Sequence, residues 1–242
     1  MASAGTDRVV APPSPATGRP STDRRDLVAL GATLITITAW NLGRSTIVPA
    51  HAGIPANLTT AAVFGGIAWL GGLGWDGVGL ARDRMVRGLA YGGVVFGIVL
   101  VVLVLAGAVP ATSGVLNDDR VHVGTMTMLF EVLVAIPFGT VVLEELAFRG
   151  TLLGLLRGRL STPVAVGVTS VVFGLWHIKG VLHDPAGGMA WGAVVGTVAA
   201  TTTAGVAFAW LRLRSGSLLA PILAHIATNS LAFAVAWAYW RS

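Results

Sequence analysis

The sequence of 242 residues contains no cysteine and few charged residues. Without cysteine, the chain can form no disulfide, no thiolate nucleophile and no cysteine metal site. Charged residues make up 11% of the sequence, less than half of the roughly 25% found in soluble domains. Hydrophobic residues make up 54%, and the mean hydropathy is +0.77. Such a protein cannot cover its apolar residues with a charged shell, so lipid must supply the missing solvent.

Acidic residues are also scarce, with three Glu and eight Asp against one Lys and fifteen Arg. The net charge of +5 and the pI of about 11.0 would favour nucleic acid as the partner of a soluble protein. Here the arginines lie between apolar runs, and no basic patch alternates with aromatic residues. We therefore expect no nucleic-acid partner, and the lipid bilayer is the first predicted partner.

Seven apolar segments follow the N-terminal tail, and most are close to the ~20 residues that cross a bilayer core. They are residues 27–43, 58–75, 89–109, 124–147, 163–182, 188–211 and 217–240. The predicted fold is therefore an all-α polytopic transmembrane bundle of about seven helices. Residues 1–26, which carry four prolines, are predicted to form a disordered cytoplasmic tail. Residues 27–123 would form the N-terminal transmembrane helices.

The positive charges divide unequally between the two sides of this bundle. If the segments alternate in direction and Arg149 is set aside, eleven Lys and Arg residues lie on the side of the N-terminus and four on the other. Positively charged flanks favour the cytoplasm. We therefore predict a multi-pass cell-membrane protein with a cytoplasmic N-terminus and a C-terminus on the opposite side.

Glycines recur every four residues on two segments. They are Gly93 and Gly97 on the third segment, and Gly188, Gly192 and Gly196 on the sixth. Stripes of small residues allow helices to approach each other closely in a membrane. We expect neighbouring helices to pack against both stripes.

Two adjacent carboxylates, Glu144 and Glu145, lie at the end of the fourth apolar segment. Glu145 and Arg149 are four residues apart on one helical face, so they can form an ion pair. Glu144 points about 100° away and has no such partner on its own helix. A carboxylate held beside apolar groups takes up a proton more readily, as a general base requires. A solvated helix end with one surface salt bridge is the alternative.

Two histidines follow on later apolar segments. His177 lies four residues after Phe173 near the end of the fifth segment, and His225 shares a face of the seventh segment with Asn229. A single membrane histidine more often holds helices together by hydrogen bonds than it catalyses a reaction. Two histidines with an asparagine at helical spacing and an unpaired Glu144 indicate a polar pocket in which these residues act together.

In this order the residues resemble the CPBP family of intramembrane proteases, which comprises CAAX prenyl proteases and bacteriocin-processing, or Abi, proteins. The three motifs are Glu144-Glu145-x-x-x-Arg149, Phe173-x-x-x-His177 and His225-x-x-x-Asn229. The resemblance implies that residues 124–242 form the catalytic transmembrane core of an endopeptidase. It implies that Glu144 and His177 activate water and that His225 and Asn229 stabilise the oxyanion. It assigns structural support to Glu145, Arg149 and Phe173.

The sequence leaves the mechanism and the class of function open. Glu144, His177 and His225 could bind zinc, or they could activate water without a metal, so a metalloprotease and a glutamate-dependent protease both fit. A non-enzymatic membrane immunity or scaffold protein and an ion or proton transporter are the other classes. The predicted substrate is a membrane-associated peptide or protein. The bias toward Arg, Ala and Gly is typical of a GC-rich, bacterial genome.

The depth of the site in the membrane is the difficult point of this interpretation. Straight spans place Glu144 near the cytoplasmic end of its segment and His177 toward the far end of its own, a mismatch of about 10 to 15 Å. To relax this mismatch, Pro137 can kink the fourth helix, Gly150 can end it, and residues 151–160 can form a short returning helix. The polar pocket is predicted to open toward the arginine-rich side, which is the nearer side to Glu144.

Overall fold

The computed structural model describes residues 24–109, 112–116, 118–182 and 191–242. These residues form helices and no strand, and seven of the helices are long and apolar enough to cross a membrane. The prediction of an all-α bundle of about seven spans is confirmed for this part of the chain. The tail predicted over residues 1–23 lies outside the described residues.

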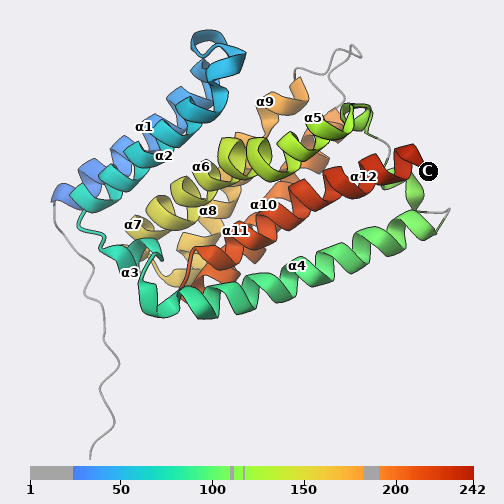
Figure 1. Ribbon diagram of the computed structural model, residues 1–242. Coiled ribbons are helices and arrows are strands. Elements are labelled where there is room, and N and C mark those ends of the chain that lie inside the picture. Colours follow the sequence, from blue (N-terminus) through green and yellow to red (C-terminus); the bar gives the residue numbers. More distant parts are fainter. Residues whose placement is uncertain (1–23, 110–111, 117, 183–190) are drawn as a thin grey trace, which may run out of the picture.

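Consecutive long helices run in opposite directions along one bundle (Figure 1). The first three are α1 (Arg24–Ile47), α2 (Gly53–Leu70) and α4 (Met85–Ala108), with the short helix α3 (Trp75–Val78) between the last two. The fourth span, Thr125–Arg157, contains α5 (Thr125–Phe130), α6 (Val142–Glu145) and α7 (Leu153–Arg157). The last three are α8 (Thr162–Trp176) followed by α9 (Ile178–Leu182), then α10 (Trp191–Ser215), then α11 (Leu219–Ile226) with α12 (Ala232–Arg241).

Short irregular turns connect or interrupt these helices. Turns of 3-10 helix lie at Ala50–Ala52, Arg82–Arg84, Ser113–Leu116 and Asp119–Val121. Turns of π-helix lie at Glu131–Ala135, Pro137–Val141, Leu146–Leu152 and Ala227–Leu231. Three of the π-helical turns belong to the fourth span and one to the seventh. The two spans that carry Glu144 and His225 are therefore the locally widened ones, as is frequent at functional sites.

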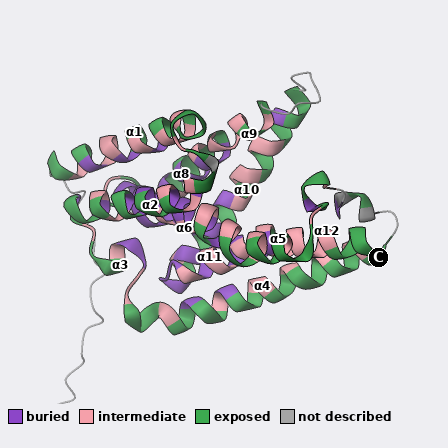
Figure 2. Cartoon of the chain, turned by 45° about the horizontal axis from the view of Figure 1, so that its top comes forward, coloured by how far each residue is buried: buried purple, intermediate pink, exposed green. Residues whose placement is uncertain are grey.

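The outer surface of the bundle is apolar, and ionisable side chains lie inside it within an otherwise apolar core, the arrangement expected in lipid. Much of the surface of α4 is exposed in Figure 2, and its exposed side chains include Leu89 and Val101. By contrast, Glu145, Arg149 and His225 are buried among the helices. Ionisable groups inside a membrane protein face the bundle interior because exposing them to hydrocarbon costs several kcal/mol, about 2.5 to 3.5 even on the lenient scale.

The fourth span is longer than the predicted segment 124–147. It continues through Gly150 to Arg157, so the predictions that Gly150 ends it and that a separate returning helix follows are wrong. Glu144 consequently lies in the interior of the helix and not near its end. This position removes the expected mismatch in depth with His177.

The polar side chains between Glu145 and Arg157 find hydrogen-bond partners inside the bundle. The fourth span can therefore continue past its acidic pair as a buried helix. Arg149 donates to Glu145 one turn back, and the Thr151 hydroxyl donates to the Phe64 carbonyl of α2 at 3.1 Å. Leu152 and Leu153 then pack in the main apolar core. Taken alone, the polar residues Arg149 and Thr151 indicate a helix end in solvent. They are compatible with a buried helix because hydrogen-bond acceptors are available inside the bundle.

Boundaries also shift at the first two spans. Residues 24–26, predicted to belong to the tail, form the first turn of α1, where Asp26 interacts favourably with the helix dipole. The second span begins at Gly53, five residues before its predicted start, because Pro55 is tolerated in the first turn of a helix. It ends before Gly72, whose φ of 82° is left-handed.

Close helix contacts use glycines other than those of the predicted stripes. A Cβ atom would meet nothing within 4 Å at Gly93, Gly97, Gly192 or Gly196, and Gly188 lies outside the described residues. The packed position on α4 is instead Gly92, where a Cβ would lie 2.8 Å from Leu223 Cβ of α11. The prediction is wrong because a stripe shows where a helix could approach, while only the tertiary arrangement decides which face meets a neighbour.

Gly92 and Gly93 therefore provide a matched pair for a stability test. Gly92→Ala should destabilise the folded protein by about 1–3 kcal/mol because its methyl group overlaps Leu223. Gly93→Ala should leave stability unchanged or raise it, since the position is open and Ala favours a helix by about 1 kcal/mol. Thermal unfolding of both variants in detergent micelles measures the difference. Equal transitions for the two variants would contradict the close contact of α4 with α11.

Candidate active site

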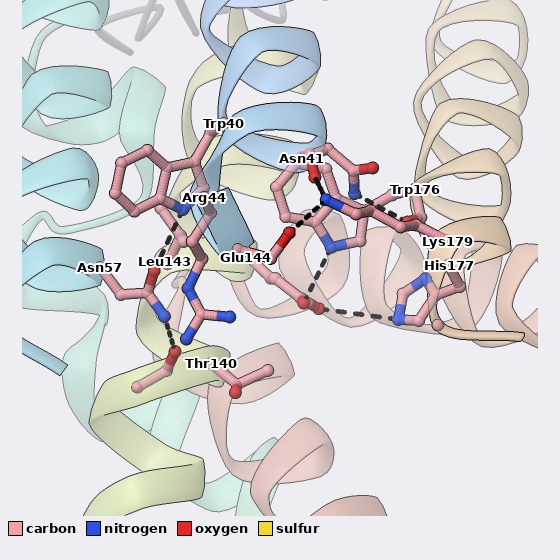
Figure 3. Close-up of a pocket in the computed structure, with 13 residues that line it drawn as sticks. Trp40, Asn41, Arg44, Asn57, Thr140, Leu143, Glu144, Trp176, His177 and Lys179 are labelled. Atoms are coloured by element: carbon pink, nitrogen blue, oxygen red, sulfur yellow. Dashed lines mark hydrogen bonds and ion pairs between the residues drawn. The ribbon is translucent and has the colours of Figure 1, made fainter. Parts of the chain in front are cut away.

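Glu144, His177 and His225 lie next to one another inside the bundle, although they come from three different spans. Glu144 Oε2 is 4.0 Å from His177 Nε2 and 3.9 Å from His225 Nε2. Figure 3 shows Glu144 and His177 facing each other at the wall of a cavity. The structure thus brings together three of the four residues that the sequence predicted to act together.

The Glu144 carboxylate is buried, and only one of its two oxygens accepts a hydrogen bond from the described residues. Its Oε1 accepts a hydrogen bond from Trp176 Nε1 at 3.0 Å. Its Oε2, which faces the two histidines, has no hydrogen-bond partner in the described part of the chain. Leaving a buried acceptor without a donor costs about 1–3 kcal/mol of folding free energy, and more when the acceptor is charged. This oxygen is therefore a strong acceptor for a water molecule.

His177 is oriented by the end of α8. The helix stops at Trp176, so its last carbonyls have no partner within the helix. His177 Nδ1 lies 2.8 Å from the Phe173 carbonyl, and Asn41 of α1 donates to the Trp176 carbonyl at 2.8 Å. Because a carbonyl only accepts, Nδ1 must carry the hydrogen, and a neutral ring then presents the lone pair of Nε2 toward Glu144.

His225 is held by a buried network that starts from Glu145. Glu145 Oε1 lies 2.8 Å from His225 Nδ1 and also accepts from Arg149 Nη1 at 2.8 Å. The His225 ring stacks on Phe208 with ring centres 5.0 Å apart. The predicted ion pair between Glu145 and Arg149 is confirmed, and the structure extends it to His225. The network directs His225 Nε2 toward Glu144.

Phenylalanine rings surround the Arg149 guanidinium. Its central carbon lies 4.0 Å from the ring centre of Phe173 and 5.1 Å from that of Phe208. Its Nε and Nη2 have no hydrogen-bond partner in the described residues. Cation–π contacts of this kind are worth about 2 kcal/mol when desolvated. Phe173 therefore supports the site by contacting the cation that holds Glu145 in place.

Asn229 is the fourth residue that the sequence predicts to act in the polar pocket, and it does not contact the other three in the way that they contact one another. It lies in the π-helical turn Ala227–Leu231 that follows α11, and its Oδ1 is 3.5 Å from the Thr228 hydroxyl. Among the described residues, no hydrogen bond joins Asn229 to Glu144, His177 or His225. Its role in the reaction stays a prediction.

A cavity of about 460 Å³ adjoins Glu144 and His177. Its polar lining consists of Asn41, Arg44, Ser45, Asn57, Thr140, Glu144, His177 and Lys179. Arg44 and Lys179 belong to the end of the bundle where α1 finishes and α9 begins, opposite to the end that contains α3 and α7 (Figure 1). The prediction that the pocket opens toward the arginine-rich side is therefore wrong, because the continued fourth helix fills that side with apolar residues.

Several residues of this cavity were missed from the sequence. Trp40 Nε1 donates to Asn57 Oδ1 at 3.0 Å, and Asn57 donates in turn to the Gly139 carbonyl of the fourth span. Lys179 donates to the Asn41 carbonyl at 3.0 Å. The sequence features that could have indicated these residues are the side-chain amides of Asn41 and Asn57, in or beside apolar segments, and Lys179, the single lysine of the chain.

Glu144, His177 and His225 carry oxygen and nitrogen atoms of the kinds that bind zinc. Two ligands of a tetrahedral zinc ion at about 2.1 Å lie about 3.4 Å apart. The separations here are 3.9 and 4.0 Å. Among the described residues, no group of three His, Cys, Asp or Glu side chains is arranged to hold a metal ion. As placed, the donors fit a bridging water, with hydrogen bonds of about 2.8 Å, better than zinc.

The buried network makes a prediction about stability. Arg149→Met should destabilise the protein by about 3–5 kcal/mol, because it leaves the Glu145 charge buried without its cation. Arg120→Gln, which breaks an exposed pair with Asp118, should cost at most about 1 kcal/mol. Unfolding in detergent compares the two variants, and an equally small loss for Arg149→Met would contradict a stabilising role of the buried pair with Glu145.

Comparison with known proteins supports the reading of the three motifs. The family model described as Rce1-like, type II CAAX prenyl endopeptidase, matches residues 126–231. No match was found among curated proteins or among solved structures. The matched segment contains all three motifs and the spans that carry Glu144, His177 and His225. With seven apolar spans among its described residues, the chain is a multi-pass membrane protein, and its segment 126–231 is similar to the Rce1-like family of type II CAAX prenyl endopeptidases.

Proposed function

We propose that the protein is an intramembrane endopeptidase that hydrolyses a peptide bond of a membrane-associated protein or peptide. The observation that carries the proposal is the buried, unpartnered Glu144 Oε2, which faces two imidazole nitrogens beside a cavity. The match to a family of CAAX endopeptidases supports the same class of reaction. A purely structural role for these groups would leave an acceptor oxygen unsatisfied without benefit.

A water molecule between Glu144 and His177 would be set for attack. Glu144 Oε2 is an acceptor, and so is His177 Nε2 when the ring is neutral and Nδ1 donates to the Phe173 carbonyl. The water would donate one hydrogen to each and keep a lone pair free for the scissile carbonyl. Glu144 would take the proton as the bond forms and pass it to the leaving amine, which is general base and then general acid catalysis.

His225 and Asn229 are proposed to stabilise the oxyanion. A His225 ring held by Glu145 at Nδ1 can donate from Nε2 when that atom is protonated. Asn229, four residues further along the same span, is the proposed second donor through its amide. Removing one donor of this type costs about 2.7–4 kcal/mol of transition-state stabilisation.

The cavity beside Glu144 is the proposed entrance for the substrate. Its lining combines tryptophan rings with the cations Arg44 and Lys179. The unequal division of positive charge supports the proposal that the arginine-rich end and the N-terminus face the cytoplasm. The entrance would then lie toward the opposite surface of the membrane.

Substitution of Glu144 tests the catalytic assignment. Glu144→Gln keeps the shape and the bond from Trp176 but removes the base, so cleavage should fall by about 10²–10⁴-fold. The control is Glu131→Gln, which changes another glutamate of the same span outside the site. Release of fluorophore from a prenylated CAAX peptide in proteoliposomes is measured, with an unprenylated peptide as second probe. Unchanged cleavage by Glu144→Gln would refute the role of Glu144.

Chelation tests whether the water needs a metal. Because the donor spacing fits water, the wild-type protein should keep its cleavage activity after treatment with 1,10-phenanthroline and dialysis. Cleavage that is lost on chelation and restored by zinc would contradict the metal-free site. That outcome would leave the endopeptidase function itself standing, since Glu144→Gln tests it separately.

A further inference from the structure

A second polar cavity lies at the arginine-rich end of the bundle, away from Glu144. Its volume is about 400 Å³, and its charged lining residues are Arg84, Arg157, Arg212 and Asp76. They come from the connection between α2 and α4, the end of α7 and the end of α10. Three guanidinium groups therefore surround one space that contains a single lining carboxylate.

Arg212 is buried, with 4% of its surface exposed. Its Nη2 donates to the Asp76 carbonyl at 3.0 Å and to the Gly77 carbonyl at 2.9 Å. Its Nε is buried and has no hydrogen-bond partner in the described residues. Buried cations are normally neutralised by a carboxylate, but the contacts of Arg212 are to neutral carbonyls. Among the described residues, the carboxylate whose charge acts on Arg212 is that of Asp76, which also pairs with Arg84, so part of the Arg212 charge is left for something outside the protein to balance.

The other two arginines add to this imbalance. Arg84 pairs with Asp76 at 3.1 Å and lies 3.9 Å from the Asp83 carboxylate, and all three side chains are at least partly exposed. Arg157 forms no hydrogen bond or ion pair within the part of the chain that the structure describes. Both arginines lie close enough to repel the Arg212 guanidinium. Of the two carboxylates beside Arg84, Asp76 lines the cavity and Asp83 does not, so three guanidinium groups share the cavity wall with one acid.

Two glycines in the left-handed region make room for these side chains. Gly79 has a φ of 91° and Gly216 a φ of 71°. A Cβ atom at Gly79 would collide with the Arg212 guanidinium, and one at Gly216 would lie 2.6 Å from Arg84 Cδ. The backbone around the cavity is therefore shaped to admit the arginines, which distinguishes it from a loose group of surface charges.

We infer that this cavity binds a phosphate group, either that of an anionic phospholipid headgroup or free phosphate. Planar guanidinium groups match phosphate oxygens in paired hydrogen bonds, and several of them around one space suit a multiply accepting anion. The cavity lies at an end of the bundle, where headgroups meet the helix termini. The excess of Lys and Arg at this end predicts that it faces the cytoplasm, whose leaflet is anionic.

The test measures lipid retention by native mass spectrometry on the full chain in neutral detergent. Phosphatidylglycerol should be retained more strongly than phosphatidylcholine, whose trimethylammonium group the arginines repel. Arg157→Gln should weaken retention by about tenfold, the loss of one charge-assisted contact. Arg214→Gln is the matched control, because Arg214 is exposed at the same end but does not line the cavity.

Asp76→Asn should act in the opposite direction. It removes the carboxylate that competes for Arg84 while keeping the backbone carbonyl that Arg212 uses, so retention should increase. A misfolded variant would not bind more tightly. Equal losses in Arg157→Gln and Arg214→Gln would overturn the proposal in favour of diffuse surface charge.

A titration with inorganic phosphate separates the two sources. Phosphate that displaces phosphatidylglycerol in an Arg157-dependent manner supports a headgroup site. Arg157-dependent phosphate binding without preference for the anionic lipid supports a site for free phosphate. If neither ligand depends on Arg157, the cavity is not a phosphate site.

Discussion

One carboxylate oxygen, Glu145 Oε1, joins two membrane spans at the centre of the bundle. It accepts from Arg149 on its own span and from His225 on the seventh, both at 2.8 Å and both away from solvent. A buried charge is tolerated only where its partners are fixed, and breaking such a pair costs about 3–5 kcal/mol. The register of the two spans is therefore set by this contact, and His225 Nε2 can face Glu144 only while it persists.

The same constraint explains why the fourth span does not end at its acidic pair. Since Arg149 is satisfied by Glu145 and by the rings of Phe173 and Phe208, the helix can carry a cation through the core. The π-helical turn Leu146–Leu152 widens the helix at this place. Glu144 is thereby moved away from the membrane surface to the depth of His177, where its second oxygen is left without a donor.

Sequence alone was sufficient where the physical rule is local. Long apolar runs predicted the seven spans, and a spacing of four residues predicted the pair of Glu145 with Arg149. The grouping of Glu144 with His177 and His225 followed from motif order. Contacts between distant residues were beyond such rules: Asn41 with the Trp176 carbonyl, 135 residues apart, carries no periodic signal. The direction of the pocket was mistaken for the same reason, because it depends on what fills the opposite end.

Chemistry and access are divided between two parts of the chain. The groups proposed to act on water and carbonyl lie within the matched segment 126–231. The cavity that leads to them is walled on one side by Trp40, Arg44 and Asn57, which lie outside it. Side chains at an entrance decide which substrates fit, whereas the base and the oxyanion donors act on any peptide bond. If the proposed reaction holds, we expect substrate preference to reside in α1 and α2, so a change of these helices would alter selectivity while the Glu145 network keeps His225 facing Glu144.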